Sequence, residues 1–302
     1  MARVAPDWRT RFDGVAERVL LSATPLLHQL NQVVASSGER IEGGLVMEND
    51  VRIDGSSSPH ARGAQKRDLF VGLARVGTRM LEVGFNAGHS AALALTANPT
   101  LEYEGFDLCA HNYTARCYDL LAHRFPGRVS LTCGDSVVRL RRQEFRLWMN
   151  RSRRYDLIHV DGGHDGDIPL LDLLNARPLS ARHNVVLFDD TDSLALTQVW
   201  QQLVRARMIL HHGHSDEIGA RLTESRRRAR ACDFDQTRRR CRQGLRSTFG
   251  SFTFVTDLAP DDRLPGEAAA PVIHPTGVHR GMRTAKSQPT RRFRLRGYES
   301  VI

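Results

Sequence analysis

A regular alternation of short apolar strands and helical segments in the middle of the chain constrains its fold most. Five segments are typical of strands because they are short, apolar and rich in β-branched residues: RMLEVG, LEYEGFDL, RVSLTCGDS, YDLIHVDGG and NVVLFDD. Each leads into a segment with helical character, at residues 88–97, 113–125, 137–150, 168–176 and 194–206. Repeated strand–helix units cross over right-handed and form a mostly parallel sheet with helices on both faces. The sequence therefore predicts a doubly wound, Rossmann-like α/β fold.

The segments around this core are predicted from their composition. Residues 1–63 are expected to form a helical and lid segment, because apolar residues recur at helical spacing before a long Gly- and Ser-rich connection. The core domain is expected at 64–258 and ends in two strands, RMILHH and SFTFVTDL, on either side of an arginine-rich insertion at 213–250. One of these strands would be antiparallel. Residues 259–302 lack apolar periodicity, which predicts a disordered tail.

The basic charge of the chain is local. The formal net charge is +9, and the segment from Arg221 to Arg246 holds ten arginines against three acidic residues. An exposed insertion with solvated charges is the favoured interpretation, and nucleic acid is kept as a less favoured partner.

The sequence shows no sign of a membrane or secreted protein. No run of about 18 apolar residues is present, and the first residues, MARVAPDWRTRFDG, are charged. We therefore expect a cytoplasmic location and no membrane partner. Five cysteines without a CxxC pair are expected to be reduced thiols. The oligomeric state is left open.

A glycine-rich turn follows the first strand, in LEVGFNAGHSA. Glu82 ends the strand, and Gly84 and Gly88 stand before the next helix. Glycine lets the backbone pass close to a ligand, and the N–H groups at the start of the helix can bind a carboxylate. The spacing differs from the GxGxxG of dinucleotide-binding folds. The turn therefore indicates another kind of cofactor site, unless it serves only strand–helix packing.

Acidic residues also end the second and third strands. Asp107, in GFDL, stands where doubly wound folds place a carboxylate that accepts hydrogen bonds from ribose hydroxyls. Asp135, followed by Ser136 in CGDS, is placed to meet an adenine amino group. For Asp135, an exposed aspartate at a strand end is an equally good interpretation.

Three carboxylates end the fourth and fifth strands. Asp161 lies in IHVDGGH, and Asp189 and Asp190 lie in VLFDDTD. If these strands are neighbours, the three acids meet at one edge of the sheet and repel one another. A hard divalent cation, Mg²⁺ or Mn²⁺, is therefore expected to bind Asp161, Asp189 and Asp190. The alternative is that Asp190 and Asp192 cap the next helix, and of these we expect Asp192 to be the cap.

His164 follows Asp161 by three residues. A histidine there can take the proton from a substrate hydroxyl held by the metal, so Asp161 and His164 are the expected catalytic residues. The alternative is a solvated loop histidine.

In this order, LEVGFNAGHSA, GFDL, CGDS, IHVDGGH and FDDTD resemble the motifs of class I S-adenosylmethionine (SAM)-dependent methyltransferases. The resemblance covers residues 66–257 and is nearest to metal-dependent small-molecule O-methyltransferases whose fourth-strand motif reads DGGH. It implies the sheet order 3-2-1-4-5-7-6 with strand seven antiparallel, SAM and Mg²⁺ as cofactors, and a small-molecule acceptor. The residues that it implies for SAM binding are Glu82, Gly84, Phe85, Asn86, Gly88, Asp107, Asp135 and Ser136.

Two other functions stay open. A metal-dependent glycosyltransferase would use the D-x-D of Asp190 and Asp192, although this motif is short and does not explain Glu82 or Asp107. A non-catalytic or RNA-associated methyltransferase-like domain would bind through the arginine-rich insertion. The sequence decides neither the acceptor nor between O- and N-methylation.

Overall fold

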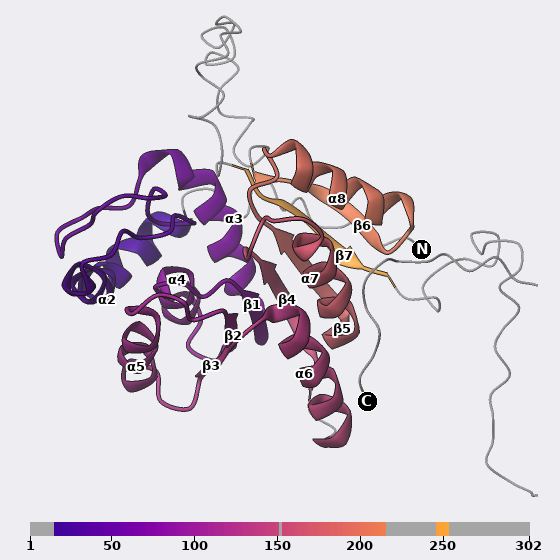
Figure 1. Cartoon of the computed structure of the whole chain (residues 1–302), viewed down its shortest axis with the longest axis horizontal. Helices are drawn as coiled ribbons and strands as arrows, with labels where there is room; N and C mark the ends of the chain where they lie inside the picture. Colours follow the sequence, from indigo (N-terminus) through magenta and orange to yellow (C-terminus); the bar gives the residue numbers. More distant parts are fainter. Residues whose placement is uncertain (1–14, 151–152, 216–245, 254–302) are drawn as a thin grey trace, which may run out of the picture. The chain divides into compact units, whose positions relative to one another are not determined.

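The computed structural model describes residues 15–150, 153–215 and 246–253, all within the unit Met1–Ala259 (Figure 1). Most of the predicted insertion and the whole predicted tail, 259–302, lie outside the described residues. Their expected properties therefore stay predictions.

The described strands form one seven-stranded sheet of order β3-β2-β1-β4-β5-β7-β6. The first five strands pair in parallel, whereas β7 is antiparallel to both β5 and β6. This arrangement confirms the predicted Rossmann-like fold, its strand order and its antiparallel seventh strand. The strands are β1 (Arg79–Val83), β2 (Glu102–Asp107), β3 (Val129–Cys133), β4 (Tyr155–Val160), β5 (Ser180–Phe188), β6 (Ile209–His214) and β7 (Thr248–Phe252).

Helices cover both faces of the sheet (Figure 1). They are α2 (Val15–Ser37), α3 (Ala64–Ala74), α4 (His89–Ala97), α5 (Thr114–Arg124), α6 (Ser136–Asn150), α7 (Ile168–Ala176) and α8 (Leu194–Arg205), with short 3-10 turns η1 (Ala61–Gly63) and η2 (Arg177–Leu179). In the described part of the chain, no helix is both long enough and apolar enough to cross a membrane.

The central strands β1 and β4 are mostly apolar because both of their faces are buried. Helices α2 to α5 pack in one hydrophobic cluster, and α6 to α8 pack in another. Successive strand side chains point to opposite faces. Met80 therefore joins the first cluster and Leu81 the second, and Leu157 and Ile158 divide in the same way.

The connection between α2 and η1, residues 38–60, folds back onto α3. Ile41 and Val51 form an isolated bridge, which closes the connection on itself. The Arg67 guanidinium donates to the backbone carbonyls of Leu45 and His60 at 3.2 and 2.9 Å. These contacts hold the connection close to the carboxyl ends of the strands. Whether it moves as a lid stays a prediction.

Two local expectations were wrong. Cys109 and Cys133 form a disulfide, because the register that pairs Asp107 with Cys133 brings the residues after β2 beside the end of β3. Strand register is not visible in cysteine spacing, and only Cys117 is a free, buried thiol among the described cysteines. The N-cap of α8 is Ser193, which has the extended backbone of a cap residue, and not Asp192.

Candidate functional site

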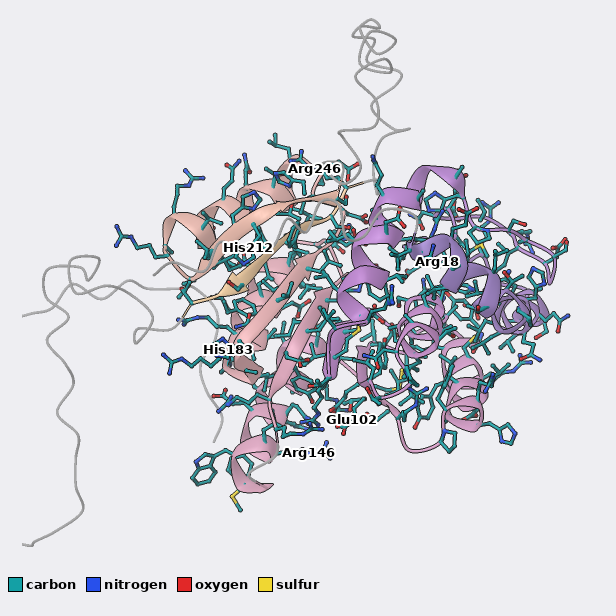
Figure 2. All side chains as sticks on the ribbon, turned by 180° about the vertical axis from the view of Figure 1, so that it is seen from behind. Arg18, Glu102, Arg146, His183, His212 and Arg246 are labelled. Carbon is teal, nitrogen blue, oxygen red and sulfur yellow. A yellow bond between two sulfur atoms is a disulfide. The ribbon has the colours of Figure 1, made fainter. Side chains whose placement is uncertain are left out.

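The sheet changes its winding direction between β1 and β4. Helix α4, after β1, lies on one face, and α7, after β4, lies on the other. The two connections therefore diverge and leave a crevice at the carboxyl ends of these strands, where open α/β sheets bind ligands. Figure 2 shows Arg246, which precedes β7, at this edge, and Glu102, at the start of β2, at the opposite edge. The site residues expected from sequence all follow strands that end at this edge.

The glycine turn between β1 and α4 is built for close packing. Gly84 and Gly88 have φ of +95° and +72°, which L side chains rarely adopt. A Cβ on Gly84 would lie 2.0 Å from the backbone oxygen of Asp161. A Cβ on Gly88 would lie 2.6 Å from Leu121 and 2.7 Å from the ring of Phe85. Packing within the protein therefore already requires both glycines, whatever else they allow.

We expect Gly84→Ala to lower the free energy of unfolding by more than about 2 kcal/mol. The left-handed backbone costs about 1–2 kcal/mol for a non-glycine residue, and the overlap with Asp161 adds to that cost. Gly127→Ala is the matched control, because Gly127 has φ of +74° and open space around its Cβ position. Urea unfolding measures both variants. Equal losses would show that the Asp161 overlap costs nothing.

Two of the residues expected to bind the cofactor point into the protein. The Glu82 carboxylate is fully buried and accepts hydrogen bonds from Ser90 at 2.7 Å and from Tyr103. His159 Nδ1 lies 2.6 Å from its other oxygen. The Phe85 ring is buried against Tyr103. The side chains of Glu82 and Phe85 thus support the glycine turn from inside the protein, and only their backbone atoms are left to contact a cofactor.

Asp107 holds the turn from the next strand. Its carboxylate accepts from the backbone N–H of Asn86 at 2.7 Å and from that of Cys109 at 2.6 Å. Because an ionised carboxylate has about four acceptor sites, Asp107 keeps capacity for ribose hydroxyls. The Asn86 side chain donates to the carbonyl of Glu42 and accepts from Tyr113, so it ties the turn to the connection 38–60.

Asp135 and Ser136 stand at the start of α6. Asp135 is exposed and accepts from the backbone N–H of Val137 at 2.9 Å, as an N-terminal helix cap does. The Ser136 hydroxyl donates to buried Asp172 at 2.6 Å. Burial raises the pKa of Asp172 to about 6. Asp135 lies beside the crevice, and its role toward adenine stays a prediction.

A buried lysine lies beneath the acidic edge. Lys66, in the first turn of α3, places Nζ 2.8 Å from Asp189 Oδ1 and 3.1 Å from Asp190 Oδ1. The side chains of Lys66 and Asp189 are fully buried. Burial lowers the pKa of a lysine, but the charges of Asp189 and Asp190 outweigh this effect and raise the pKa of Lys66 above its usual value. Lys66 is therefore an ammonium ion inside the protein.

A second buried cation lies beside it. His159, inside β4, has Nδ1 at 2.6 Å from Glu82 and Nε2 at 3.7 Å from Asp189 Oδ2. Burial alone would lower the pKa of His159, but the carboxylates of Asp189 and Glu82 raise it to about 10. Lys66 likewise holds the pKa of Asp189 well below its usual range, although burial opposes this. The buried part of the edge is thus a chain of alternating charges, Glu82, His159, Asp189 and Lys66.

The solvent-facing part of the edge consists of Asp161, His164 and Asp190. One ligand atom from each lies within 4.8 Å of the other two. His164 Nε2 is 3.7 Å from Asp190 Oδ2, and the His164 side chain is 49% exposed. Burial, and then the charges of Asp189 and Asp190, raise the pKa of Asp161 well above its usual value. Asp161 also lies below the connection 38–60, since a Cβ on Gly44 would be 3.6 Å from its Oδ2.

The three carboxylates expected to hold a divalent cation are already partly occupied by protein donors, although one ligand atom each of His159, Asp161 and Asp189 lies within 4.8 Å of the other two. Asp189 Oδ1 already accepts from Lys66, from the Ser247 hydroxyl at 2.5 Å and from the Asp190 N–H at 2.9 Å. Its Oδ2 lies 3.7 Å from His159 Nε2, and neither atom has a hydrogen-bond partner in the described part of the chain. An ion held by all three acids would lie beside the buried Lys66 ammonium, which repels it.

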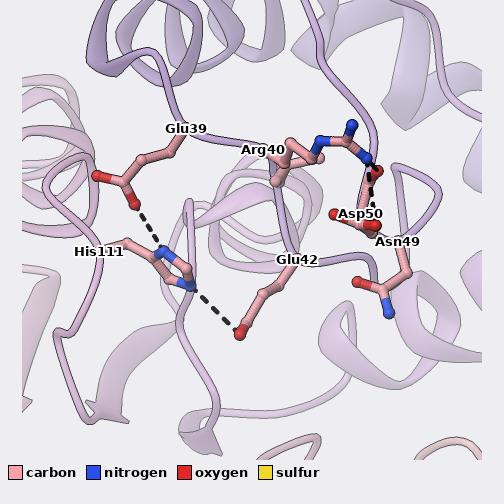
Figure 3. Close-up of a pocket in the computed structure, with 7 residues that line it drawn as sticks. Glu39, Arg40, Glu42, Asn49, Asp50 and His111 are labelled. Atoms are coloured by element: carbon pink, nitrogen blue, oxygen red, sulfur yellow. Dashed lines mark hydrogen bonds and ion pairs between the residues drawn. The ribbon is translucent and has the colours of Figure 1, made fainter.

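A pocket of about 470 Å³ lies between the connection 38–60 and the loop after β2, and no residue of the acidic edge lines it (Figure 3). His111 bridges its walls, with Nδ1 at 2.8 Å from Glu39 and Nε2 at 3.3 Å from Glu42. Burial opposes protonation, but the two carboxylates outweigh it and raise the pKa of His111. The bridge attaches the N-terminal segment to the loop that follows Asp107.

Sequence reasoning missed the buried cations and the His111 bridge. A signal existed for Lys66, which is one of only two lysines in a chain rich in arginine. His159 is a polar residue between the apolar residues Ile158 and Val160 of its strand, which is uncommon in a buried sheet. Nothing in the sequence pairs His111 with Glu39 and Glu42.

Residues 81–191 match the protein family described as a methyltransferase domain. The matched segment runs from β1 to the residues just after β5, so it contains the glycine turn, Asp107 and the acidic edge. The sheet order and this match together support a SAM-dependent methyltransferase. The search of curated proteins returned no match.

Solved structures resemble the chain at low identity. A candidate O-methyltransferase from Klebsiella pneumoniae is 16% identical, with 80% of this chain and 91% of that chain covered and a TM-score of 0.43. The O-methyltransferase TomG from Streptomyces achromogenes, solved with SAM, is 18% identical, with 62% and 78% covered and a TM-score of 0.43. Fibrillarin from Aeropyrum pernix is 14% identical, with 59% and 68% covered and a TM-score of 0.39. At these values the likenesses bear on neither the substrate nor the partners of this chain.

Proposed function

We propose that the chain is a SAM-dependent O-methyltransferase that acts on a hydroxyl group of a small molecule. One observation carries the proposal. At the switch point of this sheet, the glycine turn and Asp107 lie at the same edge as the acidic residues that follow β4 and β5. A nucleoside-binding half and a proton-accepting half therefore adjoin, as methyl transfer from SAM to a hydroxyl requires.

The β1–β2 half has the groups that a nucleoside cofactor needs. The turn from Gly84 to Gly88 leads into the N-terminus of α4, whose backbone N–H groups can bind a carboxylate, and Asp107 keeps free acceptor sites for hydroxyls. When bound, SAM supplies a methyl group already activated by its sulfonium. The protein has only to align an acceptor oxygen and remove its proton.

The β4–β5 half supplies the proton acceptor. His164 is accessible to an acceptor hydroxyl because about half of its side chain is exposed. Asp190 Oδ2 lies 3.7 Å from His164 Nε2 and can stabilise the imidazolium that forms. Because the connection 38–60 packs over Asp161, the space at this edge suits a small molecule better than a nucleic acid. This geometry favours the DGGH branch of small-molecule enzymes within the proposal.

The alternatives have less support. Nothing in the fold or in the family match supports a glycosyltransferase, whose D-x-D would need Asp190 and Asp192 free for a nucleotide sugar. The arginine-rich stretch that would serve RNA binding lies mostly outside the described residues.

Calorimetry with S-adenosylhomocysteine, the demethylated product of SAM, tests the proposal. We expect binding by the wild-type chain and a loss of about 10- to 100-fold in affinity for Asp107→Asn, the size expected for a hydrogen bond to a charged group. Asp119→Asn, on the exposed side of α5, is the control and should bind like wild type. Binding of UDP in place of S-adenosylhomocysteine would refute the assignment.

A further inference from the structure

We propose that the ammonium group of Lys66 takes the place between Asp189 and Asp190 that a divalent cation takes in the enzymes the motifs resemble. The inference rests on the proposed function and concerns how its acidic edge is neutralised. In this protein, the cation would be part of the chain.

The position of Lys66 supports this inference first. Its Nζ touches one oxygen of each β5 aspartate, at 2.8 and 3.1 Å, which are hydrogen-bond distances to both at once. The side chain reaches this point from α3 and is fully buried. The ammonium is therefore a fixed component of the edge.

The competition for ligands supports it further. Mg²⁺ requires near-ideal octahedral oxygen coordination at about 2.0–2.1 Å. Asp189 Oδ1 has three protein donors, and Asp190 Oδ1 is held by Lys66. The oxygens left are those of Asp161, Asp190 Oδ2 and Asp189 Oδ2, which has no hydrogen-bond partner but lies 3.7 Å from His159 Nε2. A divalent ion held by these oxygens would share Asp189 and Asp190 with the Lys66 ammonium, whose positive charge repels it.

The contact between Lys66 and Asp190 also positions His164, the residue proposed to meet the acceptor. Asp190 has φ of +52°, a left-handed conformation uncommon for an aspartate. With Oδ1 fixed on Lys66, its Oδ2 points to His164. Lys66 is thus a positioning residue, which acts on His164 through Asp190. A strained backbone at this point is typical of a functional site.

Titration of the full-length chain with Mn²⁺, followed by electron paramagnetic resonance of the free ion, tests the inference without an acceptor. We expect the wild type to bind Mn²⁺ no more tightly than millimolar. We expect Lys66→Met to bind it at least about tenfold more tightly, because removing the ammonium leaves Asp161, Asp189 and Asp190 without their nearest cation. Lys286→Met removes the only other lysine and should behave like wild type.

Three outcomes would overturn the inference. The first is micromolar Mn²⁺ binding by the wild type that Asp190→Asn abolishes. The second is a folded Lys66→Met chain that gains no Mn²⁺ affinity. The third concerns a Lys66→Met chain that does not fold without metal. Mn²⁺ should then restore its circular dichroism spectrum, and a spectrum that Mn²⁺ leaves unchanged would contradict the inference. S-Adenosylhomocysteine affinity, measured on the same samples, reports separately on the proposed function.

Discussion

Replacing Lys66 with methionine is expected to lower the free energy of unfolding by about 3–5 kcal/mol, the cost of removing one partner from a buried ion pair. Asp189 would keep its charge in the interior without its nearest cation, and Asp190 would lose its contact with Lys66. Methionine nearly preserves the length and packing of the lysine stem, so the loss reports on the charge. Urea unfolding monitored by circular dichroism measures it.

Arg40→Met is the control for this variant. Arg40 pairs with Asp50 at 3.2 Å, but both side chains are more than half exposed. Such a pair contributes at most about 1 kcal/mol. The double variant Lys66→Met/Asp189→Asn should recover part of the stability, because it removes the unpaired charge together with its partner. Equal losses of unfolding free energy for Lys66→Met and Arg40→Met would mean that the Lys66–Asp189 pair contributes no more than an exposed pair.

The fold could be predicted because its signals are local. Each strand is a short apolar run bounded by turn residues, and the helices begin within a few residues of where periodicity places them, as at Ile168–Ala176. The order of the strands came from the resemblance of the motifs to a known class. The acids after β1, β2, β4 and β5 were expected at one edge because parallel strands bring their ends together.

The interior of the site could not be predicted because it depends on pairs far apart in sequence. Lys66 and Asp190 are 124 residues apart, and neither motif around the acids contains a lysine or an arginine that would reveal the pairing. Glu82 ends its strand as expected, but the period-two alternation of the sheet turns its carboxylate toward His159 and away from the crevice. The Cys109–Cys133 disulfide likewise depends on strand register.

His164→Ala is expected to lower the rate of methyl transfer by about 10²- to 10⁴-fold at neutral pH, the contribution of a well-placed general base. The affinity for S-adenosylhomocysteine should not change, because the cofactor half of the site is built on β1 and β2. The rate is measured as transfer of a labelled methyl group from SAM to a panel of small phenols and alcohols. His183→Ala is the matched control, since His183 is exposed on β5, away from the acidic edge (Figure 2).

The pH and chelator dependence of the same assay identify the role of His164. Raising the pH should partly restore the His164→Ala rate, because a growing fraction of the acceptor hydroxyl then ionises without a base. EDTA should leave the wild-type rate unchanged, since the Lys66 ammonium already lies between Asp189 and Asp190. Turnover that is lost in EDTA and recovered with Mg²⁺ would show that the reaction needs a divalent cation at this edge. His164 would then be a metal ligand or take no part in the reaction. A pH-independent loss in His164→Ala would instead mean that the histidine only shapes the acceptor site.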